Sequence, residues 1–210
     1  MNSIFNYFQI SVLFVFTCLF IARTIYMRRV KKTSVITVTL NSKETRNILT
    51  VSMSATICAF VAVLIIHVFH PEINFEPLAL NIVIVETVAA KIVGMVVVSA
   101  GFLIYTVAMF TLADYWRVGD AAKQTSTLIT RGIYSLSRNP IYIFFVLYFL
   151  GTFLINGIVI FLIFTIMMAL NAHYLIVEEE KYLLKSYGSA FKKYCAVTGR
   201  YVTCKRGIKI

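Results

Sequence analysis

The longest uncharged stretch of the chain, residues 141–177, constrains the fold more than any other feature. It is far longer than the roughly 20 apolar residues that one helix needs to cross a bilayer. Asn156 and Gly157 lie near its middle, and this pair suits a tight reversal because glycine accepts a positive φ and asparagine tolerates one. The stretch therefore predicts two helices that form a membrane hairpin.

Three further uncharged runs cover residues 4–22, 48–69 and 92–113. Since 60% of the residues are hydrophobic and 14% are charged, an ordinary soluble domain is excluded. We expect an all-α fold: an integral membrane bundle of five transmembrane helices. The first run lacks a small-residue cleavage pattern after its apolar core, so we interpret it as an anchor rather than a removed signal peptide.

The charge distribution predicts the orientation. Twenty Lys and Arg residues face nine Asp and Glu residues, for a net charge of +11. With five spans, the basic residues between spans one and two, between spans three and four, and after span five all fall on one side. Because Lys and Arg are retained on the cytoplasmic side, we expect the N-terminus outside and the C-terminus inside. With no soluble fold to carry a basic patch, no nucleic-acid partner is expected.

The segment on the opposite face is apolar over residues 78–88. A sixth crossing there would move the later basic residues outside, so we reject it. We expect this segment either to lie on the outer membrane interface or to extend the third span.

Several common sites are not indicated. His67 and His70 are three residues apart, but nothing obvious completes a metal site, and none is expected. No two cysteines have CxxC spacing, so neither zinc nor a disulfide framework is indicated. The chain also lacks Gly-x-Gly, which removes the dinucleotide fingerprint and the P-loop.

Polar residues gather first in residues 128–142, directly before the predicted hairpin. Pro140 suits the first turn of a helix, and Asn139 before it is a natural N-cap. The free amides and positive dipole of this helix start offer a place for an anionic ligand. The alternative is an ordinary capped helix with interfacial tyrosine and arginine anchors.

The second polar group is the run Glu178 to Glu180, where the last span leaves the membrane. A helix C-terminus disfavours carboxylates, so we expect the helix to continue as an amphipathic C-terminal helix on the membrane surface. Its apolar positions recur every three or four residues: Leu183, Leu184, Tyr187, Phe191 and Tyr194. We expect one carboxylate to face the bundle and one to pair with Arg131 or Arg138. The alternative is a solvated face that pairs with Lys181 and Lys185.

Taken together, these motifs resemble a known superfamily. The chain resembles the isoprenylcysteine carboxyl methyltransferases and phospholipid methyltransferases, which are membrane enzymes that use S-adenosylmethionine. The motifs that carry this resemblance are residues 130–142, the hairpin that follows them, Glu179-Glu180, Tyr187-Gly188, Tyr194 and residues 198–201. The resemblance covers about residues 114–201 and includes a bacterial-type stretch at Trp116, Arg117 and Gly119. It implies two regions, three N-terminal spans in residues 1–113 and a methyltransferase core in residues 114–210.

The resemblance also implies a cofactor pocket between the hairpin and the tail, for which no catalytic residue is assigned. The expected cofactor-binding residues are Leu128, Ile129, Gly132, Tyr134, Arg138, Asn139, Pro140, Tyr142, Glu179 and Glu180. Carboxyl methyltransferases usually have histidine where this chain has Asn139, and arginine where it has Leu175. These two departures make a prenylcysteine carboxylate less suited as the acceptor.

The expected chemistry is in-line methyl transfer, in which positioning and exclusion of water supply most of the rate. A carboxylate of Glu179 or Glu180 would bind the cofactor's amino or ribose groups, Arg138 its carboxylate, and Tyr134, Tyr142 and Trp116 its adenine and sulfonium.

We therefore expect a membrane methyltransferase that acts at the cytosolic face on a lipophilic or membrane-anchored acceptor. Such an acceptor, a small molecule or a prenylated or lipid group, would gain lateral access between the last two spans. The alternative function is a non-enzymatic membrane scaffold or permease whose basic tail binds anionic membrane lipids.

Overall fold

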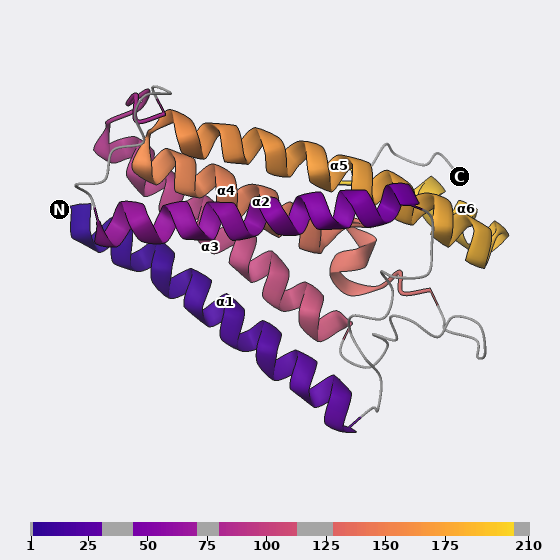
Figure 1. The fold of residues 1–210 in the computed structure, drawn as a ribbon. Coiled ribbons are helices and arrows are strands. Elements are labelled where there is room, and N and C mark those ends of the chain that lie inside the picture. The colour runs from indigo at the N-terminus through magenta and orange to yellow at the C-terminus, as the bar shows by residue number, and fades with distance from the viewer. Residues whose placement is uncertain (1, 31–43, 71–79, 113–127, 204–210) are drawn as a thin grey trace.

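The computed structural model describes residues 2–30, 44–70, 80–112 and 128–203, and these residues are helical apart from short connections. Figure 1 shows α1 (Asn2–Val30), α2 (Glu44–Phe69), α3 (Val88–Thr111), the 3-10 helix η1 (Gly132–Ser135), α4 (Pro140–Asn156), α5 (Val159–Tyr187) and α6 (Ser189–Val197). No named strand occurs in the described ranges, so the all-α prediction is confirmed for them.

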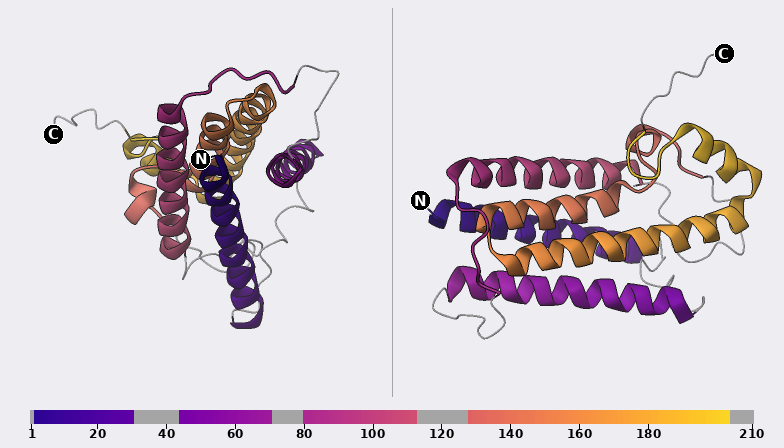
Figure 2. Two further views of the ribbon diagram at one scale, coloured as in Figure 1. Left: turned by 90° about the vertical axis from the view of Figure 1, so that its left-hand side faces the viewer. Right: turned by 90° about the horizontal axis from the view of Figure 1, so that it is seen from above.

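Four helices are long and apolar enough to cross a membrane: Ile4–Tyr26, Asn47–Phe69, Val88–Thr111 and Val159–Tyr187. The fifth apolar helix, α4, has 17 residues, which at 1.5 Å each gives about 26 Å. Helices α1 to α5 alternate in direction, as Figures 1 and 2 show. The N-terminus, the start of α3 and the α4–α5 turn lie at one end, called the hairpin end, and η1 and α6 lie at the other, called the site end. This is the architecture of a multi-pass membrane protein.

The predicted turn at Asn156 and Gly157 is confirmed. Helix α4 ends there, and Gly157 has φ 71°, so a side chain at this position would be strained. A Cβ on Gly157 would also lie 1.7 Å from the Val85 carbonyl oxygen. The turn therefore needs glycine both for its conformation and for its close contact with the chain before α3.

Residues 80–87 pair with this turn instead of lengthening α3. The Ile84 amide donates to the Gly157 carbonyl at 2.7 Å, and the Val159 amide donates to the Ile82 carbonyl at 3.0 Å. Helix α3 begins only at Val88, where the Thr87 hydroxyl accepts from the Ala90 amide at 3.2 Å. The expectation that this segment extends the third span is therefore wrong for residues 80–87, because the hairpin turn supplies their backbone partners.

Helices α3 and α4 cross at short range because glycines face each other. A Cβ on Gly94 would lie 2.7 Å from the Gly151 carbonyl oxygen, and one on Gly151 would lie 2.5 Å from a methyl carbon of Val98. Small residues of this kind let helix backbones approach closely in membranes, where packing rather than the hydrophobic effect drives association. The first helix of the hairpin is thereby fixed against the third span.

An aromatic core joins the remaining helices. The rings of Phe60 and Phe149 stack with centroids 3.8 Å apart, which joins α2 to α4. Phe16 of α1 packs on Tyr105 of α3 and Phe144 of α4, with centroid distances of 4.8 and 5.0 Å. Aromatic pairs at such distances contribute about 1 kcal/mol each beyond their buried area.

Buried amides add directional links between helices. The side chain of Gln9, fully buried in α1, exchanges hydrogen bonds of 3.3 and 3.0 Å with Asn156 of α4. Asn171 of α5 accepts from the Ser52 hydroxyl at 3.0 Å and donates to Thr56 of α2 at 3.1 Å. Hydrogen bonds of this type hold apolar helices in one rotational setting.

Candidate functional site

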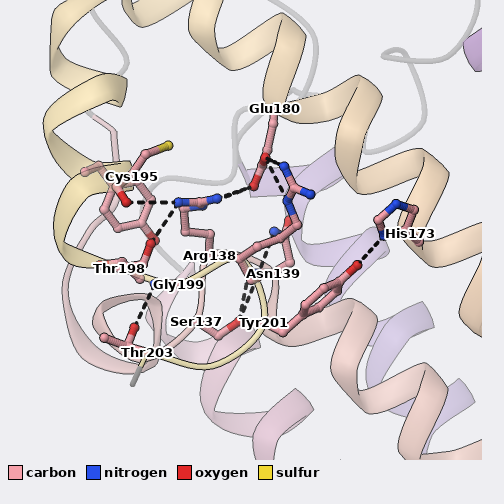
Figure 3. A network of polar contacts seen from close by, with 12 residues as sticks. Ser137, Arg138, Asn139, His173, Glu180, Cys195, Thr198, Gly199, Tyr201 and Thr203 are labelled. Carbon is pink, nitrogen blue, oxygen red and sulfur yellow. Dashed lines mark hydrogen bonds and ion pairs between the residues drawn. The ribbon is translucent and has the colours of Figure 1, made fainter. Parts of the chain in front are cut away.

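Three segments that are distant in sequence meet at the site end. They are the η1 loop before α4, the last turns of α5, and residues 198–203 after α6 (Figure 3). Within the η1 loop, Gly132 has φ 60°, and a Cβ at this position would lie 3.2 Å from the methyl carbon of Thr111 at the end of α3. The loop is thereby packed against the third span.

An ion triad joins the three segments. Arg138 donates from Nε and Nη2 to Oε1 of Glu180 at 3.1 and 2.8 Å, and Arg200 donates from the same two atoms to Oε2 at 3.0 and 2.7 Å. The side chains of Arg138 and Glu180 are 11% and 12% exposed, and that of Arg200 is 38% exposed. Each carboxylate oxygen of Glu180 therefore has its own arginine, and the Arg138 pair is shielded from solvent.

The predicted pairing of one carboxylate with Arg138 is confirmed at Glu180. Glu178 instead forms an ion pair with Lys181 at 2.6 Å, as the alternative of a solvated face predicted for the run. Arg200 lies in the motif of residues 198–201, but no role was assigned to it, because nothing in that motif indicates a carboxylate partner on α5.

Backbone hydrogen bonds tie residues 198–203, here called the tail strap, to the η1 loop. The Arg138 amide donates to the Gly199 carbonyl at 3.1 Å, and the Thr203 amide donates to the Leu136 carbonyl at 2.8 Å. Arg138 Nη1 also donates to the carbonyl of Thr198 at 2.8 Å and to that of Cys195 at 3.3 Å. The Arg138 side chain thus donates four hydrogen bonds within the protein, two to Glu180 and two to backbone carbonyls that lead into the tail strap.

The helix start is partly as predicted. Pro140 occupies the first turn of α4 and Asn139 precedes it, but the Asn139 side chain makes no capping hydrogen bond. Its Nδ2 donates to the Arg200 carbonyl at 3.1 Å. The prediction of an asparagine side-chain cap is wrong, because a carbonyl of the tail strap takes this side chain instead.

The predicted continuation of the helix past the glutamates is confirmed as far as Tyr187, but its unbroken course to Tyr194 is wrong. Helix α5 carries the glutamates and continues to Tyr187, but Gly188 has φ 53° and the chain turns before α6. Phe191 and Tyr194 of α6 are 3% and 6% exposed, so they pack inside the protein. The three-to-four-residue spacing was read as one helix because a glycine reversal leaves the apolar spacing unchanged.

Two phenols and a carboxylate gather beside the triad. The Tyr142 hydroxyl donates to Oε1 of Glu179 at 2.7 Å. Burial raises the pKa of Tyr134, and the negative charge of Glu179 adds to that effect. The Tyr194 hydroxyl donates to the Tyr134 carbonyl, and burial raises the pKa of Tyr194 to about 12. Glu179 therefore has Tyr142 in contact and Tyr134 within electrostatic range.

The other predicted site residues are less involved. Leu128 and Ile129 lie half-buried before η1, and no described polar contact of the triad or strap includes them. Trp116, Arg117 and Gly119 lie outside the described residues. Cys204 and several basic residues that were used to predict orientation, between 31 and 43 and between 113 and 127, lie outside them as well.

A further pair was not predicted. His173 Nδ1 and the Tyr201 hydroxyl are 2.6 Å apart, which joins an exposed face of α5 to the tail strap (Figure 3). His173 is a single histidine within an apolar run, and its partner lies 28 residues later, so the sequence carried no signal for the contact.

The family model described as phospholipid methyltransferase matches residues 89–190. The matched segment belongs to this family. The phospholipid methyltransferase family lies within the superfamily of the isoprenylcysteine carboxyl methyltransferases, so the resemblance seen in the motifs is confirmed. A search of curated proteins gave no match.

The phospholipid methyltransferase segment begins in α3 and therefore reaches further toward the N-terminus than the motifs indicated. It contains η1, the α4–α5 hairpin and the glutamate run, and it ends just after α6 begins. Arg200 and the rest of the tail strap follow it. The family match indicates methyl transfer as the type of reaction. The four long apolar helices indicate that the protein lies in a membrane.

Proposed function

We propose that this chain is an S-adenosylmethionine-dependent methyltransferase that acts on a lipophilic or membrane-associated acceptor at the cytosolic face. The family match supports methyl transfer and a lipid-type substrate. The cofactor, the acceptor and the side of the membrane are the parts that we add.

The observation that carries the proposal is the group formed by Glu179, Tyr142 and Tyr134. A sulfonium or an ammonium group is a cation, and a carboxylate with neighbouring aromatic rings is the environment that binds such cations well. Tyr134 is 9% exposed, so part of this surface is shielded from water, where electrostatic attraction is stronger. The residues present therefore fit S-adenosylmethionine.

The ion triad positions the group formed by Glu179, Tyr142 and Tyr134. Arg138 holds Glu180, and the adjacent residue Glu179 is thereby set at a fixed place on the last turns of α5. Because Arg138 already donates to Glu180 and to two backbone carbonyls, we assign it to positioning of the pocket wall and the tail strap. Gly132, Asn139 and Pro140 shape the loop that faces α5, and Leu128 and Ile129 are proposed to extend its apolar side.

The bound cofactor would supply an electrophilic methyl group on sulfur. The chain's own contribution is to bind the cationic part with Glu179 and the tyrosines, to orient it, and to exclude water with the tail strap. Positioning of this kind accounts for much of the barrier reduction in group transfer. No side chain is proposed as a catalytic base, in keeping with a reaction that depends mainly on alignment.

Five crossings with the site end in the cytosol are also part of the proposal. Among the described residues, several basic ones lie in or next to η1, the last turns of α5 and α6, which form the site end: Arg131, Arg138, Lys181, Lys192 and Arg200. Lys and Arg favour the cytoplasmic side of short connections. Helix α4 would make the shortest crossing, supported by its close packing on α3.

Binding of S-adenosylhomocysteine to the detergent-purified protein tests the cofactor assignment by calorimetry. Glu179→Gln and Tyr142→Phe are expected to weaken binding by about tenfold or more, because each removes a charge or a hydrogen bond worth roughly 1.4 kcal/mol or more. The matched controls are Glu178→Gln, whose carboxylate pairs with exposed Lys181, and Tyr174→Phe, which lies exposed on α5. No heat of binding, or equal losses in the controls, would reject the pocket.

The acceptor is tested with membranes that contain the protein and methyl-labelled S-adenosylmethionine. We expect label to enter the lipid fraction, and Glu179→Gln to abolish it. Label confined to soluble products would reject a lipophilic acceptor. Salt-dependent binding of anionic lipid with no label transferred to any fraction would favour the scaffold instead.

A further inference from the structure

A cavity separates α1 from α3 near the site end, away from the glutamate run. Its volume is about 290 Å³, close to the lower end of the roughly 300–1,000 Å³ found for small-molecule sites. It is lined by Leu19, Ala22, Arg23, Tyr26, Tyr105, Thr106, Met109 and Phe110. Phe110 and Tyr26 are 73% and 46% exposed, so the cavity opens on the outer surface of the bundle, where lipid would surround it.

The wall combines apolar side chains with a cation and a buried hydroxyl. Arg23 supplies the positive charge, and its Nη2 donates to the Leu112 carbonyl at 3.4 Å. Tyr105 is 2% exposed, and its hydroxyl has no hydrogen-bond partner among the described residues. A buried hydroxyl without a partner destabilises the protein, and a ligand oxygen that accepts from it would offset that cost.

The side chains of Arg23 and Tyr105 lie in the same part of the cavity wall. Both line the cavity, and the guanidinium is near enough to interact electrostatically with the phenol. The Arg23 guanidinium also lies over the ring of Tyr26, 5.9 Å from its centroid, which holds the arginine at the mouth of the cavity. A cation and a hydroxyl donor side by side suit an anionic oxygen, and phosphate offers several.

The apolar part of the wall suits a hydrocarbon chain. Leu19 and Ala22 on α1 face Met109 and Phe110 on α3 across the cavity. A ligand that satisfies both parts has a phosphate at one end and an alkyl chain at the other. A membrane phospholipid has this chemistry and reaches the opening from the bilayer.

We propose that the α1–α3 cavity binds one phospholipid, with its phosphate against Arg23 and Tyr105 and an acyl chain between Leu19 and Phe110. This site lies apart from the proposed cofactor pocket and does not depend on methyl transfer. Arg23 precedes the phospholipid methyltransferase segment, so the proposal assigns a binding role to the N-terminal part of the chain.

Native mass spectrometry of the full chain with dioctanoyl phosphatidylglycerol tests the proposal. We expect one lipid per chain, an affinity about tenfold lower for Arg23→Gln and also lower for Tyr105→Phe, and loss of binding for Ala22→Trp, which fills the cavity. The matched control is Arg29→Gln, an exposed arginine further along α1, with an expected change of less than about twofold.

Two further probes separate the parts of the ligand. Dioctanoylglycerol, which lacks the phosphate, is expected to bind at least about tenfold more weakly than dioctanoyl phosphatidylglycerol, and inorganic phosphate is expected not to displace the lipid at equal concentration. Equal affinities for the two lipids, or equal effects of Arg23→Gln and Arg29→Gln, would overturn the proposal.

Calorimetry with S-adenosylhomocysteine on the same variants keeps the two proposals distinguishable. Unchanged binding in Arg23→Gln and Ala22→Trp shows that the variants are folded and that the loss is local to the cavity. If the unaltered protein binds the lipid but not S-adenosylhomocysteine, the proposed function fails and the lipid site stands. If Ala22→Trp binds the lipid as tightly as the unaltered protein, the lipid site fails.

Discussion

Arg138 and Glu180 are 42 residues apart in the chain, and their side chains meet at 2.8 Å. The contact joins the start of α4 to the last turns of α5. The two helices are also joined at the hairpin end by the turn at Gly157. The hairpin is therefore fixed at both ends, and the second fixed point lies within the proposed pocket.

Loss of the central carboxylate is expected to release the tail strap. Glu180→Ala leaves two arginines without their partner, which we expect to destabilise the protein by about 2 to 3 kcal/mol, below the range for fully buried pairs because Arg200 is partly exposed. The free energy change is followed by thermal unfolding in detergent. Trypsin cleavage after Arg200, identified by mass spectrometry, should become faster.

Glu178→Ala is the matched control for this experiment. It removes a carboxylate from the same helix, but one whose partner, Lys181, is 66% exposed. Exposed pairs of this kind contribute less than about 1 kcal/mol. Equal acceleration of cleavage after Arg200 in both variants would show that the triad does not hold the strap.

Close packing of α3 on α4 predicts that Gly151 does not tolerate a side chain. In Gly151→Ala the new carbon would lie 2.7 Å from the Gly94 carbonyl oxygen, so the helices must separate, at a cost of about 1 to 3 kcal/mol. Ala100→Leu, which adds more atoms at an exposed position of α3, should change the unfolding temperature little. A stable Gly151→Ala variant would contradict the described crossing.

The buried amide pair predicts non-additive effects. Asn156→Leu leaves the Gln9 side chain fully buried without this partner, and we expect a loss of about 1 to 2 kcal/mol. Adding Gln9→Met removes the stranded amide and should restore part of that loss. Thermal unfolding of the two single variants and the double variant measures the coupling. Simple additivity would mean that the two amides do not interact.

Alkaline pH is expected to weaken the contact between α6 and η1. Burial raises the pKa of Tyr194 to about 12, against about 10 for an unfolded tyrosine. Since the folded protein favours the neutral phenol, its contribution is complete below pH 10 and is lost as the pH rises from 10 to 12. Tyr194→Phe should lower the unfolding temperature at pH 8 and show a smaller further loss at pH 11. Parallel curves for both proteins would contradict this assignment.

Local chemistry explains what the sequence predicted correctly. The turn at Gly157 follows from one residue pair, and the start of α4 follows from the fixed φ of Pro140. One carboxylate of the run was predicted to pair with Arg131 or Arg138, and the structure assigns this pairing to Glu180 and Arg138. The first two inferences required only neighbouring residues, and the third left two arginines as candidate partners.

What the sequence did not predict depends on contacts between distant segments. No residue near Arg200 or Gln9 in the sequence indicates which side chain each one contacts, and their partners lie 20 and 147 residues away. Asn139 is an ordinary capping residue by type, but the Arg200 carbonyl competes for its side chain. At Gly188 the apolar spacing continued across a reversal, so the pattern concealed the break between α5 and α6.

Because Glu180 pairs with two arginines, the tail strap can detach in steps and need not break both ion pairs at once. If Arg200 swings away into solvent, Oε1 keeps its two hydrogen bonds from Arg138, and the anion is still neutralised. If the proposed pocket exchanges a spent cofactor, the tail strap beside it must move away without leaving a buried charge unpaired. The ion triad meets this requirement, because the contact of Glu180 with Arg138 stays in place when Arg200 releases.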